Sequence, residues 1–322
     1  VEDEVHLVLA DDLANRRLSR LHYRLVRRPI VEDVVNRVLQ DVLHGDRRFV
    51  VPVYQRPYVW DQERQWEPLW DDVEATAVRL AEARQSGKSK GLDAAKSDKE
   101  AAPHFLGAIV VGQSPTKTGE VDTRLIVDGQ QRMTTIQLLF RGVLDALGEA
   151  DASKQVRARV RKAVRNDDDV VDDEHLLKLT PRRAERASFE EAMQDSPADP
   201  ASSTFAAARG FFAGLAFEFL CDDQVPADPF ASSDDGTQNR ADLLAATILG
   251  LVKLVVIDLD DVDDAQVIFE ALNARNTPLS ATDLVKNLLF LKAENEHEDP
   301  EALYEALWSR FDDDSAWWIA QT

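Results

Sequence analysis

Apolar positions along the chain form short β-type runs near both ends and recur with helical spacing between them. The segments 105–111 and 121–127 predict two strands that could form a hairpin, because each is a short apolar run beside turn residues. The segment 251–259 predicts a buried strand, and 49–51 predicts a shorter one. From residue 129 to about 250 the pattern is mostly helical.

Two segments near the N-terminal third carry other patterns. Residues 31–43 have apolar positions at the helical period and are followed by Gly45, so they predict an amphipathic helix. Residues 85–102 are poor in apolar side chains, which is typical of a mobile loop. The Gly87-Lys88-Ser89 sequence in this segment is not a phosphate-binding P-loop, because position 82 holds glutamate and no strand precedes it.

Later in the chain, Pro-, Ser- and Asp-rich composition predicts loops at 195–203 and 222–240. A helix is predicted at 265–272, and helical spacing returns at 297–322.

The most informative stretch is 124–141, RLIVDGQQRMTTIQLLFR, which predicts a strand, a glycine turn and a helix. Such a turn directs free backbone N–H groups and the positive end of the helix dipole at whatever lies above it. Arg132 could add a cation, and Asp128 could hold a metal or a water. The alternative is structural: Asp128 caps the helix, Gly129 supplies the turn, and the other polar residues face water.

A second polar stretch, VPVYQRPYVW, occupies residues 51–60. Its prolines hold the backbone extended. The result is a rigid loop that could stack on a base or bond to a phosphate. Its candidate side chains are Tyr54, Gln55, Arg56 and Tyr58. The tryptophans that follow have helical spacing and are interpreted as core residues.

A third stretch, FEALNARNTPLSATDLVKNLLF, spans residues 269–290. Its asparagines and proline predict a turn between two helices. The segment is either an ordinary helical corner, or Asn273, Arg275 and Lys286 complete a site opposite the glycine turn. The spacing alone does not decide between these two interpretations.

Composition restricts the function classes. The chain has 322 residues with 59 acidic and 38 basic side chains, a formal charge of −21 that opposes a simple duplex-coating role. The arginines in 16–28 and the basic residues in 157–165 are candidate DNA contacts, and the alternative is that they pair with nearby acids. One cysteine excludes a disulfide framework and fits a reducing cytoplasm.

No secretory signal is visible, and no membrane-spanning segment or membrane partner is expected. The six histidines show no closely spaced His/Asn/His arrangement or cysteine pair that would support a nuclease metal site. His104 is interpreted as a structural residue at a strand end.

Three motifs stand together in order: VPVYQRPYVW, then FLGAIVV with IVDGQQRMTTIQLL, then FEALNARNTPLSATDLVKN. In this combination the chain resembles the N-terminal domain of the GmrSD-type, modification-dependent (type IV) restriction enzymes, including the SspE-like proteins that sense phosphorothioate DNA. The resemblance implies an α+β fold, with a small mixed β-sheet core similar to ParB and sulfiredoxin and a large helical extension. It divides the chain into an NTP-binding core at 1–150, a helical region at 151–250, and a returning strand and helices at 251–322.

The same resemblance assigns roles to individual residues. Catalysis falls on Asp128, Gln130, Gln131 and Arg132, and Asp128 would also hold Mg²⁺, which needs only one or two carboxylates beside phosphate oxygens. The nucleotide would further contact Gly129, Thr134, Tyr54, Gln55 and Arg56. Independently of the resemblance, it would also contact Asn273, Arg275 and Lys286 if the 269–290 stretch completes the site. The residues expected to sense modified DNA are Tyr54, Gln55, Arg56 and Tyr58.

The implied function is an NTP-hydrolysing sensor for antiphage restriction. It would couple nucleotide state and modified DNA to a C-terminal HNH-type nuclease domain that this chain does not contain. The alternative is a nucleotide- or DNA-binding switch or dimerisation module, for example a homodimer, that hydrolyses nothing. A nuclease within these residues is disfavoured because they carry no metal-ligand cluster.

Overall fold

The computed structural model describes residues 33–114, 121–167, 169, 171–172, 175–231, 235–259, 286, 289–290, 293 and 298–309. Six strands in this part of the chain form one mixed sheet in the order β1-β6-β3-β4-β2-β5. The strands are β1 (Asp33–Val38), β2 (Arg47–Val50), β3 (His104–Gln113), β4 (Asp122–Asp128), β5 (Leu179–Thr180) and β6 (Val252–Leu259). The helices and helical turns are α2 (Leu39–Val42), η1 (Gln62–Trp66), α3 (Glu67–Ser89), α4 (Ala94–Asp98), α5 (Gln130–Glu149), α6 (Lys154–Val164), α7 (Arg183–Met193), α8 (Thr204–Cys221), α9 (Gly236–Gly250), α12 (Pro300–Leu303) and η3 (Tyr304–Trp308).

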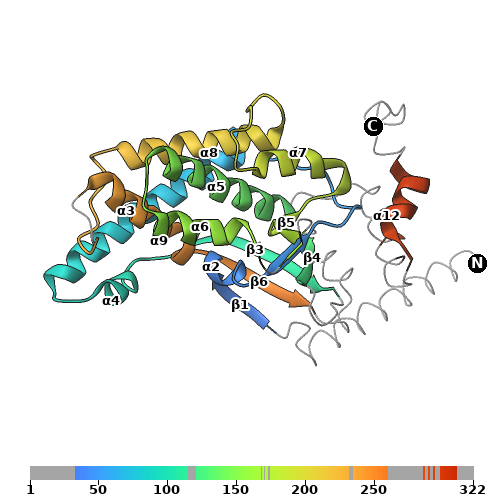
Figure 1. Cartoon of the computed structure of the whole chain (residues 1–322). Helices are drawn as coiled ribbons and strands as arrows, with labels where there is room; N and C mark the ends of the chain where they lie inside the picture. The colour runs from blue at the N-terminus through green and yellow to red at the C-terminus, as the bar shows by residue number, and fades with distance from the viewer. Residues whose placement is uncertain are drawn as a thin grey trace, which may run out of the picture.

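The long helices gather above the sheet, whereas α12 lies apart from them beyond the end of β4 (Figure 1). One continuous core joins the two layers, and α5 is its central helix, with fifteen buried residues between Gln130 and Leu147. Such burial is the largest favourable term in folding. This arrangement confirms the predicted α+β fold with a mixed sheet and a large helical part. The ParB/sulfiredoxin likeness and the three residue ranges given for the regions stay predictions.

The strands β3, β4 and β6 confirm the apolar runs predicted from the sequence. β3 pairs antiparallel with β4, as the hairpin prediction required, and parallel with β6. β2 pairs parallel with both β4 and β5. The predicted helices at 265–272 and in 310–322 lie outside the described residues.

The predicted helix at 31–43 is wrong over most of its length. Residues 33–38 form β1, which pairs antiparallel with β6 from Asp33↔Asp258 to Val38↔Lys253, and only Leu39–Val42 is helical. The valine-rich sequence DVVNRV suits a strand as well as a helix, and the backbone hydrogen bonds offered by β6 decide between them.

The predicted mobile loop at 85–102 is also wrong, because α3 continues to Ser89 and α4 follows. Arg84 donates to both carboxylate oxygens of Asp98, at 2.7 and 2.9 Å, and also pairs with Asp228. Gly87 lets the two helices touch, since a Cβ there would lie 1.9 Å from Ser97 Oγ. The Gly87-Lys88-Ser89 sequence thus ends a helix, in agreement with its rejection as a P-loop.

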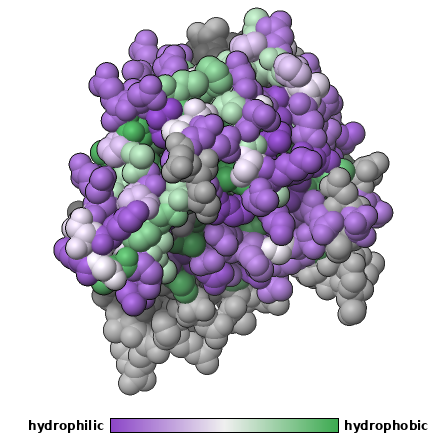
Figure 2. Space-filling model, turned by 60° about the vertical axis from the view of Figure 1, so that its left-hand side comes forward, coloured by the Kyte–Doolittle hydropathy of each residue, from purple (hydrophilic) through white to green (hydrophobic). Residues whose placement is uncertain are grey.

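The loop predicted at 222–240 is shorter than expected, because α9 begins at Gly236 under an Asp235 cap. The helix α8 has 18 residues with a mean hydropathy of 1.3, so by length and composition it could cross a membrane. In this fold it packs against α5, and its Arg209 is buried and paired with Asp145 at 2.6 Å. We therefore interpret α8 as a core helix. The face shown in Figure 2 is mostly hydrophilic, as the net charge of −21 leads one to expect.

Candidate functional site

The predicted strand–turn–helix is present: β4 ends at Asp128, Gly129 turns the chain, and α5 begins at Gln130. Gly129 has φ 89°, a left-handed conformation that glycine adopts without strain. A Cβ on this residue would lie 2.7 Å from Ile109 Cγ2, so β3 packs directly against the turn. Gly129 at the N-cap has no side chain to cap α5, and among the described residues no side chain accepts from the first N–H groups of this helix.

Arg132 returns from the first turn of α5 to the middle of β3. Its Nη1 donates to the carbonyl oxygen of Ala108. The guanidinium lies over Gly107, where a Cβ would come within 3.1 Å of Nη2. The β3–β6 register is irregular at this point, between Phe105 and Ala108. The other N–H donors of Arg132 have no partner within the described segments, so they can bind an anion.

The charge of Asp128 acts on Arg132 across the turn. Burial lowers the pKa of Arg132, and the neighbouring Asp128 carboxylate raises it in part. Arginine keeps its charge under any ordinary condition. The turn therefore combines a partly desolvated cation, a carboxylate and an uncapped helix N-terminus.

The Asp128 carboxylate suits one half of a magnesium site. It is partly exposed and forms no hydrogen bond with any described residue. Within the described ranges no group of three His, Cys, Asp or Glu side chains could hold a metal by itself. Magnesium usually takes one or two carboxylates together with phosphate oxygens. Asp128 therefore fits an ion that arrives with a nucleotide, and it does not fit an ion held by protein alone.

The two glutamines of the motif fasten the 51–60 loop to the turn. Gln130 Nε2 donates to Arg56 O at 3.0 Å, and Gln131 Nε2 donates to Pro57 O at 2.7 Å. Gln131 Oε1 in turn accepts from Val59 N at 2.9 Å. Gln55 closes the set from the loop side, since its Nε2 donates to Val127 O at 3.0 Å. We call these four bonds the glutamine clamp.

The two tyrosines of the loop pack against the protein in this conformation. Tyr54 is 8% exposed and stacks on Phe290, with ring centroids 6.3 Å apart. Tyr58 OH bonds to Thr135 Oγ1 at 2.8 Å and accepts from Trp66 Nε1 at 2.9 Å. Burial raises the pKa of Tyr58 to about 12.

Arg56 is exposed, and its side chain has no ion pair or hydrogen bond within the described part of the chain. Among the four residues predicted to sense DNA, it is the one whose side chain is presented to solvent. The DNA-sensing role of the loop stays a prediction.

The remaining predicted site residues are distributed unevenly. Thr134 is buried in α5, and Lys286 is also buried, at 3% exposure. Asn273 and Arg275 lie outside the described residues, as do the arginines of 16–28 and most of the predicted corner. His104 lies at the start of β3 with Nε2 3.4 Å from Asp72, which agrees with a structural role.

The basic residues of 157–165 mostly follow the structural alternative. Arg159 pairs with Asp242 at 2.7 Å, while Arg161 and Arg165 reach Asp195 at 3.0 and 3.6 Å. Their charges are therefore compensated within the domain, which weakens the case for this segment as a DNA contact.

Sequence reasoning missed Glu185, which joins the loop to α7. Its Oε1 accepts from Tyr58 N at 2.7 Å, and its Oε2 accepts from Arg182 Nε at 3.0 Å. No local pattern marks this residue, because its loop partner is 127 positions away.

A comparison against protein families gives a match over most of the chain. The family model for the GmrSD restriction endonuclease, N-terminal domain, matches residues 36–290. The chain belongs to this family. Its membership indicates a role in a restriction system directed against phage, with DNA as the substrate of the complete endonuclease. A comparison with curated proteins gave no match.

Proposed function

We propose that this GmrSD-family domain binds a nucleoside triphosphate at the glycine turn and hydrolyses it. One observation carries the proposal: Arg132 is held over Gly107, beside Asp128 and the uncapped N-terminus of α5. Phosphoryl transfer requires charge stabilisation and positioning more than covalent chemistry. The free N–H donors of Arg132 and the first N–H groups of α5 would bind phosphate oxygens.

Asp128 would hold Mg²⁺ together with phosphate oxygens, and the ion would neutralise charge that develops on the transferred phosphoryl group. The residues Gln130 and Gln131 position the loop, because their amides are engaged in the glutamine clamp. Arg56, whose backbone carbonyl the clamp fixes, would supply a second cation to the same ligand. Asp128 is then the residue best suited to orient an attacking water.

The proposed biological role follows from the family. Nucleotide state at the turn, together with modified DNA such as phosphorothioate DNA, would control an HNH-type nuclease domain in the complete cytoplasmic protein. The packing of Tyr54 and Tyr58 against their neighbours supports a sensor whose contacts change when DNA arrives.

Phosphate release with Mg²⁺ and ATP or GTP tests the hydrolysis, with and without phosphorothioate DNA. Asp128→Ala and Arg132→Ala are each expected to lower turnover by about a hundredfold or more, because each removes charge stabilisation from the transition state. Asp71→Ala and Arg64→Ala change the same residue types at exposed positions and are expected to leave turnover unchanged. Unaltered turnover in both site variants would refute the assignment.

The clamp also favours a second candidate, a nucleotide-binding switch without hydrolysis. Both polar atoms of the Gln131 amide already bond the loop, which leaves this side chain less free to orient a water. Tight binding of a fluorescent nucleotide that depends on Arg132, with no phosphate release at any DNA concentration, would establish this candidate instead.

A further inference from the structure

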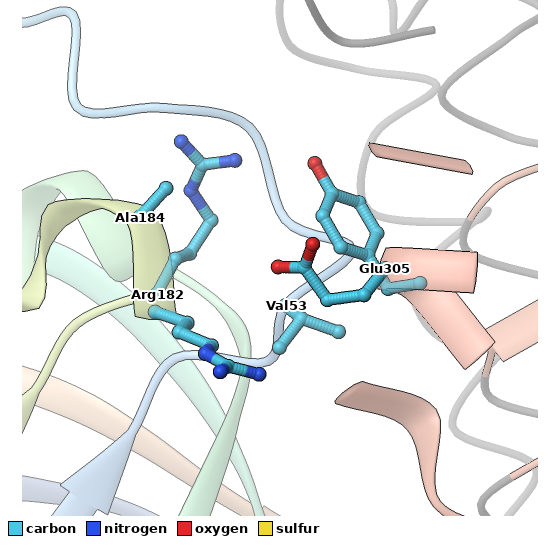
Figure 3. Close-up of a pocket in the computed structure, with 6 residues that line it drawn as sticks. Val53, Arg182, Ala184 and Glu305 are labelled. Atoms are coloured by element: carbon cyan, nitrogen blue, oxygen red, sulfur yellow. The ribbon is translucent and has the colours of Figure 1, made fainter. Parts of the chain in front are cut away.

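A pocket lies beside the 51–60 loop, between the start of α7 and the helical turn η3 (Figure 3). The lining residues come from three segments of the chain: Val53; Arg182, Arg183 and Ala184; Tyr304 and Glu305. The loop that the glutamine clamp fixes therefore forms part of its wall.

The α7 wall is basic. Arg182 is 8% exposed and is anchored at Nε by Glu185, while its terminal nitrogens have no partner in the part of the chain that the structure describes. Arg183 is exposed and has no ion pair within the same part. Arg182 and Arg183 thus bring two positive charges to this wall, on a chain whose formal charge is −21.

The opposite wall carries a negative charge. Figure 3 shows the Glu305 carboxylate extending from η3 toward the arginine side of the pocket. Glu305 forms no ion pair of 4 Å or less with any described residue, so it faces the arginines without closing on them. The Glu305 carboxylate therefore lies where an anion attracted by the two arginines would bind.

The wall that carries Glu305 is held separately from the main core. Tyr304 and Trp308 of η3 pack with Leu303 on a small cluster of Val53, Tyr54 and Phe290. Segments with few buried apolar contacts open at lower free energy than the whole domain does. From the contacts of the described residues, we expect this wall to open more readily than the main core does.

We propose that the pocket binds a phosphate group of a DNA strand through Arg182 and Arg183, and that Glu305 competes with that phosphate. The inference rests on the proposed function in one respect, namely that the domain handles DNA. Arginine pairs with phosphate in a fixed bidentate geometry, and the apolar Val53 and the ring of Tyr304 offer contacts to the adjoining sugar. Because Glu185 bonds both Arg182 and Tyr58 N, occupancy of the pocket is transmitted to the loop and the glutamine clamp.

Fluorescence anisotropy of a labelled DNA duplex, titrated with this chain at several salt concentrations, tests the proposal. Arg183→Ala is expected to weaken binding roughly five- to tenfold and to reduce the slope of log K against log salt by about one, as the loss of one phosphate contact does. Glu305→Gln is expected to strengthen binding several-fold, since it removes the competing charge but keeps the side-chain shape.

Two matched variants separate the pocket from net charge. Arg159→Ala removes one positive charge from α6, and Glu149→Gln removes one negative charge at the end of α5. If Arg183→Ala weakens DNA binding no more than Arg159→Ala does, the pocket is not a phosphate site. The same conclusion follows if Glu305→Gln strengthens DNA binding no more than Glu149→Gln does. Absence of duplex binding by the unaltered chain at low salt overturns the proposal as well.

Phosphate release from nucleotide is measured on the same variants. If the pocket proposal is wrong, nucleotide hydrolysis that depends on Asp128 and Arg132 is still observed. Failure of the proposed hydrolysis leaves the DNA titrations and their salt slopes unchanged, so the two results are distinguishable.

Discussion

At the scale of single residues, the turn depends on Gly129 more than on any of its polar neighbours. Two features disfavour any side chain at this position. The φ of 89° is a left-handed conformation, and an added Cβ would lie only 2.7 Å from Ile109 Cγ2. Gly129→Ala is therefore expected to lower the free energy of unfolding by about 2–4 kcal/mol, from backbone strain and overpacking together. Urea denaturation followed by circular dichroism measures the change.

Gly148 provides the matched control for this prediction. It lies in the same helix with no heavy atom within 4 Å of the Cβ that alanine would add. Gly148→Ala is expected to raise the free energy of unfolding by about 0.5–1 kcal/mol, because alanine favours the helix and restricts the unfolded chain. Equal stabilities of the two variants would show that the turn tolerates a side chain.

At the scale of elements, the sequence predicts those whose pattern is local. β3, β4, β6 and the helix after Gly129 follow from their own apolar spacing. The pattern predicts a helix in place of β1 because its valines fit both periods, and its partner β6 is more than 200 residues away in the chain. The pattern predicts a loop at the end of α3 because that helix end is stabilised by side-chain contacts with α4 and with Asp228, which lies 144 positions from Arg84.

The candidate site shows the same limit. Its motif residues could be selected from the sequence, because glycine and polar residues interrupt an otherwise apolar pattern. The function of the glutamines as a clamp could not be predicted from the sequence, because their partners in the loop are 72 and 74 positions away. Sequence composition predicts polar groups near a turn, whereas only the packed loop shows which amide atoms are already engaged.

The clamp itself gives a prediction about two elements. Gln131→Ala removes the acceptor of Val59 N–H and the donor to Pro57 O. Loss of bonds to partly buried groups of this kind costs about 1–3 kcal/mol locally, so hydrogen exchange of the Val59 amide is expected to quicken roughly tenfold to a hundredfold. Exchange mass spectrometry of the loop measures this, with Gln62→Ala on the exposed side of η1 as the control. Unchanged exchange at Val59 would mean that the clamp does not hold the loop.

At the scale of the whole molecule, the described residues bury their apolar side chains in two unequal groups. The main core runs from Leu39 to Val256 and joins the sheet to the helices above it. The small cluster at Val53, Tyr54 and Phe290 attaches α12 and η3 to the 51–60 loop. Opening of the small cluster would uncover Tyr54 and widen the pocket at Arg182 while the main core remains folded.

Phe290→Ala tests whether the two groups unfold independently. Phe290 is 4% exposed and touches the rings of Tyr54, Tyr304 and Trp308, so its removal takes the centre out of the small cluster. We expect exchange protection to fall in residues 300–308 while the melting temperature of the domain changes by less than about 2 °C. Phe212→Ala, a fully buried change in the main core, should instead cost about 3–5 kcal/mol and lower protection in the helices and sheet together. If Phe290→Ala destabilises the whole domain as much as Phe212→Ala does, η3 belongs to the cooperative core and cannot act as a separate wall of the pocket.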